Sequence, residues 1–168
     1  YDILQDGQPI KLKLGRSQLP YGFTVKEYGG TPSKNLVISL SQQDDVDALH
    51  QIEKEVIEQL SRASQSIFNR EMTPGEIGGI FNSNMSDGGQ LRLKYTKDSR
   101  LFNSDGQPMD KNIIDGIFSK WEVTCNYIIS GVYFMNKSVG LIIRAHHIKL
   151  FEPPQQGGFM FLTDSDDD

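Results

Sequence analysis

Residues 120–151 read KWEVTCNYIISGVYFMNKSVGLIIRAHHIKLF and contain two long strand-like runs separated by a short turn near NKS. The first run carries large apolar side chains at every second position: Trp121, Val123, Cys125, Tyr127 and Ile129. A period of two places such positions on one face of a β-strand. The stretch therefore predicts two long strands that follow each other directly, and it is the most strand-like part of the chain.

Two irregularities are expected in these strands. Gly131 interrupts the first one and predicts a bulge or a bend. In the second, the alternation breaks at AHHI (145–148), which predicts another bulge. His146 and His147 are neighbours in a strand, so we expect their side chains on opposite faces, where they cannot bind one metal ion together.

The rest of the chain predicts further strands, one helix and several loops. Strand patterns cover residues 10–14, 21–30, 35–40 and 88–103. One amphipathic helix is predicted over 41–64, with acidic residues in its first turn and an apolar stripe of Val46, Leu49, Ile52, Val56 and Leu60. Residues 71–90 are rich in glycine and predict a long loop or a poorly ordered insertion. Asp105-Gly106 suits a tight turn, and 112–118 is either a short helix or an irregular connector.

These elements predict a mainly β protein, a small and mostly antiparallel barrel or sandwich with the helix capping an end or covering a gap. Residues 1–152 are expected to form one domain. Residues 153–168 are expected to form a flexible Pro/Gly linker and a disordered acidic tail.

The charge is unevenly distributed along the chain. The whole sequence has a net charge of −5, but residues 44–62 hold six acidic and two basic residues, and residues 163–168 hold four aspartates. The remainder has 15 basic and 12 acidic residues, a net charge of +3. A mildly basic body is compatible with a polyanionic partner, although surface charge unrelated to any partner is the more common cause.

The residues with catalytic potential form no recognisable motif, so we expect neither an enzyme nor a metal site nor a cofactor. His50 has no partner at ligand spacing, and GEIGG (75–79) lacks the Lys-Ser/Thr that completes a phosphate-binding loop. No apolar run approaches the ~20 residues of a membrane helix. The single cysteine, Cys125, is expected to be a core residue and fits a reducing intracellular compartment.

Basic and aromatic residues are interleaved in GGQLRLKYTKDSRLFN (88–103). Single-stranded nucleic acid offers a line of phosphates and unstacked bases, and its binders combine a positive groove with aromatic platforms. The candidate binding residues are Lys11, Lys13, Arg16, Arg92, Lys94, Tyr95, Lys97, Arg100, Phe102, Phe134 and Lys137. The alternative is that Leu91, Leu93 and Tyr95 fill the core and the cations are merely solvated.

The last residues join an apolar patch (159–162) to aspartates. Such a segment could compete with nucleic acid for the basic groove or recruit basic replication proteins. It could equally be a solubilising end without a partner.

The order FNSDGQP (102–108), WEVTCNYIISGVYF (121–134) and VGLIIRAHHIKL (139–150) resembles the closing half of the OB-fold single-stranded-DNA-binding proteins of phages and large DNA viruses, with the African swine fever virus type as the suspected relative. The resemblance covers roughly residues 91–151. It implies an OB-like antiparallel β-barrel and a binding face that includes Arg92, Lys94, Tyr95 and Lys97. It adds Trp121, Tyr133 and Phe134 as further aromatic candidates, of which Trp121 is better explained as core.

The expected function is therefore binding of single-stranded DNA without strong sequence preference, as an accessory to replication, recombination or repair. RNA remains open as a ligand, as does the oligomeric state. The alternative is a viral protein–protein interaction or assembly module that binds no nucleic acid.

Overall fold

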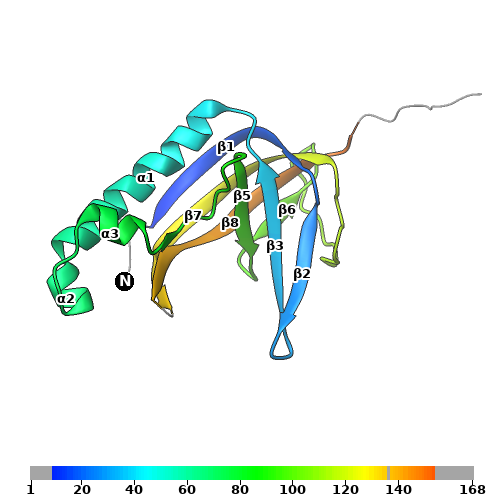
Figure 1. Ribbon diagram of the computed structural model, residues 1–168. Coiled ribbons are helices and arrows are strands. Elements are labelled where there is room, and N and C mark those ends of the chain that lie inside the picture. Colours follow the sequence, from blue (N-terminus) through cyan, green and yellow to red (C-terminus); the bar gives the residue numbers. More distant parts are fainter. Residues whose placement is uncertain (1–8, 136, 154–168) are drawn as a thin grey trace, which may run out of the picture.

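The computed structural model describes residues 9–135 and 137–153 (Figure 1). Its strands are β1 (Ile10–Leu19), β2 (Phe23–Tyr28), β3 (Thr31–Ser39), β4 (Phe81–Asn82), β5 (Gln90–Tyr95), β6 (Arg100–Phe102), β7 (Trp121–Met135) and β8 (Ser138–Phe151). Its helices are α1 (Gln43–Arg62), α2 (Ser64–Phe68) and α3 (Pro74–Gly78). The expected mainly β fold with one long helix is confirmed. The expected acidic tail lies outside the described residues.

The strands form one sheet that closes on itself. Its order is β1-β7-β8-β5-β3-β2, and an additional pairing between β1 and β3, at Gln18 and Ser39, joins the two sides. Most neighbours are antiparallel, but β4, β5 and β6 each run parallel to β8. Strand β8 therefore contacts four other strands and is the centre of the sheet.

Strands β7 and β8 form the predicted long hairpin, and both predicted bulges are present. The register shifts between Ile129 and Gly131, and again where Cys125 and Tyr127 face Ile148 and Ala145. At the second site, β8 has two residues, His146 and His147, opposite a single residue of β7. An extra residue in a bulge disturbs the alternation of faces. The prediction that the two histidines point to opposite faces is therefore wrong, because their rings stack with centroids 4.0 Å apart and planes 14° apart.

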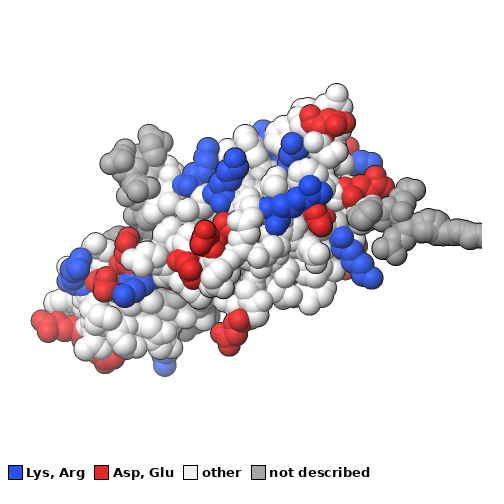
Figure 2. Space-filling model, turned by 90° about the horizontal axis from the view of Figure 1, so that it is seen from above, with Lys and Arg blue, Asp and Glu red and all other residues white. Residues whose placement is uncertain are grey.

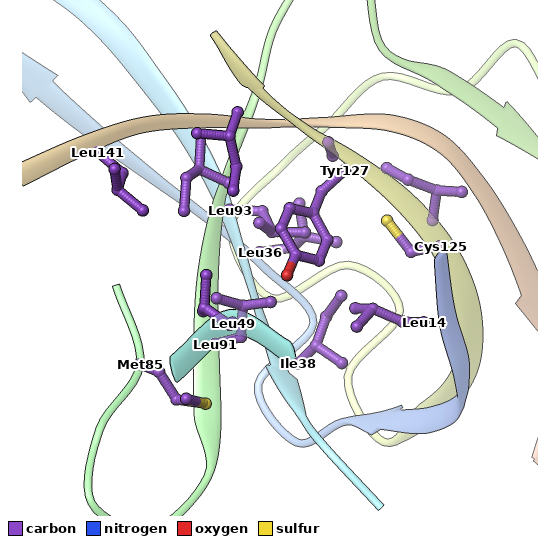
Figure 3. Packing of buried hydrophobic residues seen from close by; sticks show 14 of the residues in the cluster. Leu14, Leu36, Ile38, Leu49, Met85, Leu91, Leu93, Cys125, Tyr127 and Leu141 are labelled. Carbon is purple, nitrogen blue, oxygen red and sulfur yellow. The ribbon is translucent and has the colours of Figure 1, made fainter. Parts of the chain in front are cut away.

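The core lies inside the ring of strands, and α1 packs against this core with its apolar side (Figures 1 and 3). The predicted helical stripe is confirmed, since Leu49 and Leu60 are buried and Val46, Ile52 and Val56 are partly buried against the core. The expected inward face of β7 is also confirmed by the buried side chains of Val123, Cys125, Tyr127 and Ile129. Burial raises the pKa of the Cys125 thiol to about 12, so this cysteine is an uncharged core residue.

The glycine-rich segment 71–90 is more regular than expected. It contains α3 and β4, and α3 starts with a capping box in which Thr73 and Glu76 exchange side-chain to backbone hydrogen bonds of 2.9 and 3.1 Å. Ile77 and Met85 are buried and anchor the segment to the core. The prediction of a long loop or a poorly ordered insertion is wrong, because the cap and the buried anchors outweigh the weak helix and strand propensity of the glycines.

Residues 112–118 form irregular turns, the second of the two alternatives, and they lie along β2. The Phe23 N–H donates to the Ile117 carbonyl at 3.0 Å, and the Gly116 N–H donates to the Phe23 carbonyl at 2.7 Å. Farther along the strand, the Val25 N–H donates to the Asp115 carboxylate at 3.0 Å. The predicted turn at Asp105-Gly106 is also present, with Gly106 at φ 82°.

Glu53 is the one carboxylate of α1 that is buried, with 7% of its surface exposed, and it accepts a 2.6 Å hydrogen bond from Ser83 Oγ. Burial raises the pKa of Glu53 above its ordinary value, and this outweighs the opposing effects of Ser83 and His50. An acid whose pKa is higher in the folded state lowers stability once it ionises. Glu53 therefore costs stability as the pH rises through and above its ordinary pKa of 4.5.

We expect Glu53→Gln to raise the melting temperature at pH 7.5, because glutamine keeps an acceptor for Ser83 but carries no charge. The gain should shrink toward pH 4, where Glu53 is mostly protonated in both states. A gain of ~1 kcal/mol corresponds to about 2–4 °C for a chain of this size. Thermal melts at both pH values test this, with Glu55→Gln on the exposed side of α1 as control. A gain independent of pH would contradict the assignment.

Candidate nucleic-acid interface

The short strand β6 is held beside β8 by a buried hydroxyl. Ser99 Oγ donates a 2.6 Å hydrogen bond to the Ala145 carbonyl and accepts one of 3.0 Å from the Thr96 N–H. Ser99 is only 4% exposed, so these bonds are shielded from water. They place Arg100 beside His147 and Phe102 beside Lys149, while Leu101 points into the core.

Three rings come together on the outside of this pairing. The Phe102 ring meets the His147 ring edge to face, with centroids 5.3 Å apart, and His147 stacks on His146. The bulge in β8 makes this arrangement possible because it puts both histidines within reach of one another. The result is a row of flat side chains on the outer surface of the sheet, all of them partly or largely exposed.

Cations flank the row of rings. A hollow of about 190 Å³ lies between β1, β7, β8 and the turn after β6, and it is lined by Lys13, Phe102, Gly106, Thr124, Cys125, Asn126, His147 and Lys149. We call the outward residues Lys11, Lys13, Arg100, Phe102, Arg144, His146, His147 and Lys149 the β8 face. Figure 2 shows Lys and Arg side chains in a band across the upper part of the molecule, with some acidic side chains among them.

The positive charges are close enough to affect one another. The pKa of His146 is lowered by its partial burial and by the neighbouring His147, Lys11, Arg144 and Arg100. In addition, Arg144 Nη1 and His146 Nδ1 are buried and make no hydrogen bond within the described part of the chain. Unpaired buried polar atoms are costly. An anion bound at this place would reduce the repulsion and accept a hydrogen bond from Arg144 Nη1.

A second hollow, of about 540 Å³, lies on the other side of Phe102. Its lining residues are Tyr95, Thr96, Lys97, Ser99, Arg100, Leu101, Phe102, Pro108, Met109 and Asp110. The Arg100 guanidinium is held at its edge by hydrogen bonds of 2.8 and 3.1 Å from Nη1 to the carbonyls of Lys97 and Ser99. Phe102 belongs to both hollows, so it separates two adjacent depressions that each carry basic side chains.

Strand β5 extends the basic surface. Arg92 and Lys94 are exposed, whereas Leu91 and Leu93 are buried in the core. Lys94 is the direct strand partner of Arg144, so the cations of β5 continue those of the β8 face. Tyr95 is half-buried, and its ring packs edge to face on Phe23 with centroids 5.4 Å apart. Arg92 lines a different hollow, together with Tyr21 and Tyr133.

Three of the candidate residues lie away from this surface or are already engaged. Arg16 forms an ion pair with Glu122 and stacks over the Phe151 ring at 3.9 Å. Phe134 and Lys137 lie at the turn between β7 and β8, where Phe134 meets Phe68 of α2 edge to face. Trp121 packs edge to face on Phe118, as expected of a residue at the core. Whether any candidate residue contacts nucleic acid stays a prediction.

Sequence reasoning missed four residues of the β8 face, namely Arg144, His146, His147 and Lys149. Their signal is the run RAHHIK (144–149), from which the alternation of apolar residues predicts only a bulge, with no shared metal site for the two histidines. In the described part of the chain, no group of three or more His, Cys, Asp or Glu side chains is arranged to hold a metal ion. No helix there is both long and apolar enough to cross a membrane.

The fold is similar to that of phage proteins of known structure. One is gp2.5, a single-stranded DNA binding protein encoded by bacteriophage T7, with a TM-score of 0.56, 14% identity and 88% of each chain covered. Another is the single-stranded DNA-binding protein of bacteriophage Enc34 in complex with ssDNA, with a TM-score of 0.54, 14% identity, and coverage of 86% of this chain and 88% of the other. These matches confirm the OB-like fold. The resemblance to the African swine fever virus type stays a prediction.

No curated protein matches the sequence. A family model does match, over residues 24–159, and this range includes every strand from β3 to β8 as well as all three helices. The chain therefore belongs to the Family of unknown function (DUF5871).

Proposed function

We propose that this protein binds single-stranded DNA, without strong sequence preference, along the β8 face. The observation that carries the proposal is the row of Phe102, His147 and His146 rings with Lys13 and Lys149 beside it. Bases stack on flat side chains whatever their sequence, and cations follow the phosphates. A single strand offers both groups at once, whereas a duplex hides the faces of its bases.

The similarity to two phage proteins that bind single-stranded DNA supports the same ligand, because the shared fold covers most of each chain. OB-folds are known to bind oligonucleotides on one strand face and its adjoining loops. RNA is the natural second ligand to compare, since it carries the same phosphates and bases. We further propose an accessory role in replication, recombination or repair, in which a single strand has to be covered.

The alternative function is protein–protein interaction. Its supporting observation is a hollow of about 710 Å³ at the end of the β7–β8 hairpin, lined mainly by apolar side chains, among them Ile67, Phe68, Ile80 and Met135. The β8 face, in contrast, combines rings with cations. We favour nucleic acid as the ligand, because cations can contact its phosphates and flat rings can stack on its exposed bases.

We expect Lys13→Glu combined with Lys149→Glu to weaken binding of oligo-dT at least tenfold without lowering the melting temperature. Each cation that contacts a phosphate contributes roughly 0.7 to the slope of log K against log salt for a single strand, so the slope should fall by about 1.4. Fluorescence anisotropy at several salt concentrations measures both effects.

The matched control is Lys54→Glu combined with Arg62→Glu, because these exposed residues lie on α1. The control should bind more tightly than the β8-face variant and keep the wild-type salt slope. Equal losses of oligo-dT affinity in the two variants would indicate that DNA binds to another surface. No binding of any oligonucleotide by the wild-type protein at low salt would favour the protein-interaction alternative.

We expect Phe102→Leu to lose the stacking contribution of one base, roughly 1–3 kcal/mol, while the salt slope stays unchanged. Leucine keeps an apolar side chain beside Met109 but offers no flat ring. Titrations of wild type and variant at one salt concentration give the affinity difference, and the slopes confirm that no phosphate contact was lost. Unchanged affinity would argue against a stacking role for Phe102, whatever the slope.

The acidic segment leads to a separate proposal, that residues 157–168 compete with DNA for the cations of the β8 face. Its motivation is the cluster of aspartates at 164 and 166–168. Deleting residues 157–168 should then tighten binding, most strongly at low salt, where charge interactions are least screened. Equal or weaker affinity of the shortened chain would count against competition.

A further inference from the structure

A fourth hollow lies on the outer surface, at some distance along β8 from the row of Phe102, His147 and His146 rings. Its volume is about 410 Å³, within the roughly 300–1,000 Å³ of small-ligand sites. It is lined by Tyr21, Thr24, Val37, Asn82, Ser83, Asn84, Met85, Ser86, Gln90, Arg92 and Tyr133. Two tyrosines, three side-chain amides and one guanidinium therefore face one space.

The Tyr133 ring is held in place by a glycine. Tyr133 of β7 is the direct strand partner of Gly140 of β8. A Cβ atom added at Gly140 would lie 2.5 Å from the Tyr133 ring, so the ring occupies the space that any other residue would fill. Gly140 is thus the residue that allows Tyr133 to lie across the backbone of β8.

Tyr21 stands at another wall of the hollow with 54% of its surface exposed. The next residue, Gly22, has φ +64°, and a Cβ there would lie 2.1 Å from the Ile117 carbonyl oxygen. Only glycine fits this turn. The turn that carries Tyr21 is therefore fixed by the close approach of the connector 112–118, and a large exposed aromatic side chain is kept at the edge of the hollow.

The polar wall is also fixed by backbone contacts. The Arg92 N–H donates to the Asn84 carbonyl at 2.9 Å, and Asn84 Nδ2 donates to the Arg92 carbonyl at 3.3 Å. These bonds hold the segment before β5 against the strand. They leave the Arg92 guanidinium exposed at the rim. Asn and Gln amides form hydrogen bonds with base edges, and the Arg guanidinium forms them with both bases and phosphates.

We propose that this hollow, the tyrosine pocket, takes one unstacked nucleobase of the strand that the β8 face binds, with its face on the Tyr133 ring and its phosphate near Arg92. This inference rests on the proposed function and adds a second contact point to it. Arg92 and Lys94 both lie on the exposed side of β5, and Lys94 is paired with Arg144. This row of cations joins the tyrosine pocket to the β8 face.

The test uses the full chain and oligo-dT in which single thymidines are replaced by 5-iododeoxyuridine. Irradiation joins this base to an aromatic side chain in contact with it, and mass spectrometry identifies the joined peptide. We expect crosslinks to Tyr133 or Tyr21 in addition to crosslinks near Phe102. Tyr133→Leu should lose the first set and weaken oligo-dT binding about five- to a hundredfold, as expected for one lost stack.

Tyr133→Phe is the matched control, because it keeps the ring and should retain both the affinity and the crosslink. Gly140→Ala should displace the ring and reproduce the effect of Tyr133→Leu. If Gly140→Ala fails to fold, the comparison of leucine with phenylalanine at 133 still decides the question.

The outcomes separate the two proposals. If the wild-type protein binds oligo-dT but crosslinks only near Phe102, and Tyr133→Leu binds as tightly as wild type, the tyrosine pocket is wrong and the proposed function stands. If Tyr133→Phe weakens binding as much as Tyr133→Leu, base stacking at Tyr133 is wrong. If the wild-type protein binds no oligonucleotide at low salt, both proposals are overturned.

Discussion

The pairing of β7 with β8 is the interaction on which the rest of the structure depends. It joins Glu122–Met135 to Ser138–Phe151 along nearly the whole length of both strands. The inner faces of the two strands supply a large part of the core, including Tyr127, Ile129 and Ile148. The outer edge of β8 then receives β4, β5 and β6 in parallel, and β7 receives β1. Without this hairpin there would be no template for the short strands, since β4 and β6 have only two and three residues.

The bulge at His146 and His147 places both imidazole rings on the outer surface of the hairpin. A regular β8 would send one of two adjacent side chains inward. The extra residue instead allows His146 and His147 to stack, while Ala145 and Ile148 stay in the core. The short strand β6 adds the third ring. The hydrogen bond from Ser99 to the Ala145 carbonyl holds β6 in the register that brings Phe102 against His147. The row of rings thus depends on the bulge in β8 and on the hydrogen bond by which Ser99 holds β6 beside it.

The sequence predicted most of this fold because its hydrophobic periods are strong. The alternation of Trp121 to Ile129 and the stripe of α1 each correspond to a buried face. The same periodicity also indicated where the hairpin departs from regularity, at Gly131 and at 145–148. What it could not supply was the direction of side chains inside a bulge, since a period of two no longer applies there. For the same reason, the two histidines were assigned to opposite faces.

The candidate site was only partly accessible to sequence reasoning. The basic and aromatic pattern predicts Lys13, Arg100 and Phe102 as candidates, and they line two adjacent hollows that share Phe102. Tyr95 follows the same pattern but packs largely on Phe23, because the register of β5 turns it toward the core side. The run Arg144–Lys149 gives no local signal of a binding surface, because the rings and cations that complete this surface come from β1 and β6. Such neighbours are set by long-range pairing, which no local pattern encodes.

The connector 112–118 has a consequence for how the molecule behaves among its own copies. Strand β2 ends the sheet, and the free side of a terminal strand is a template on which another chain can add a strand. Here Ile117, Gly116 and Asp115 occupy the backbone groups of Phe23 and Val25 on that side. The irregular segment 112–118 therefore blocks the addition of another strand at this part of β2. Under the proposed function, many copies would lie close together along one DNA strand, and exposed strand edges of neighbouring copies could then pair with one another.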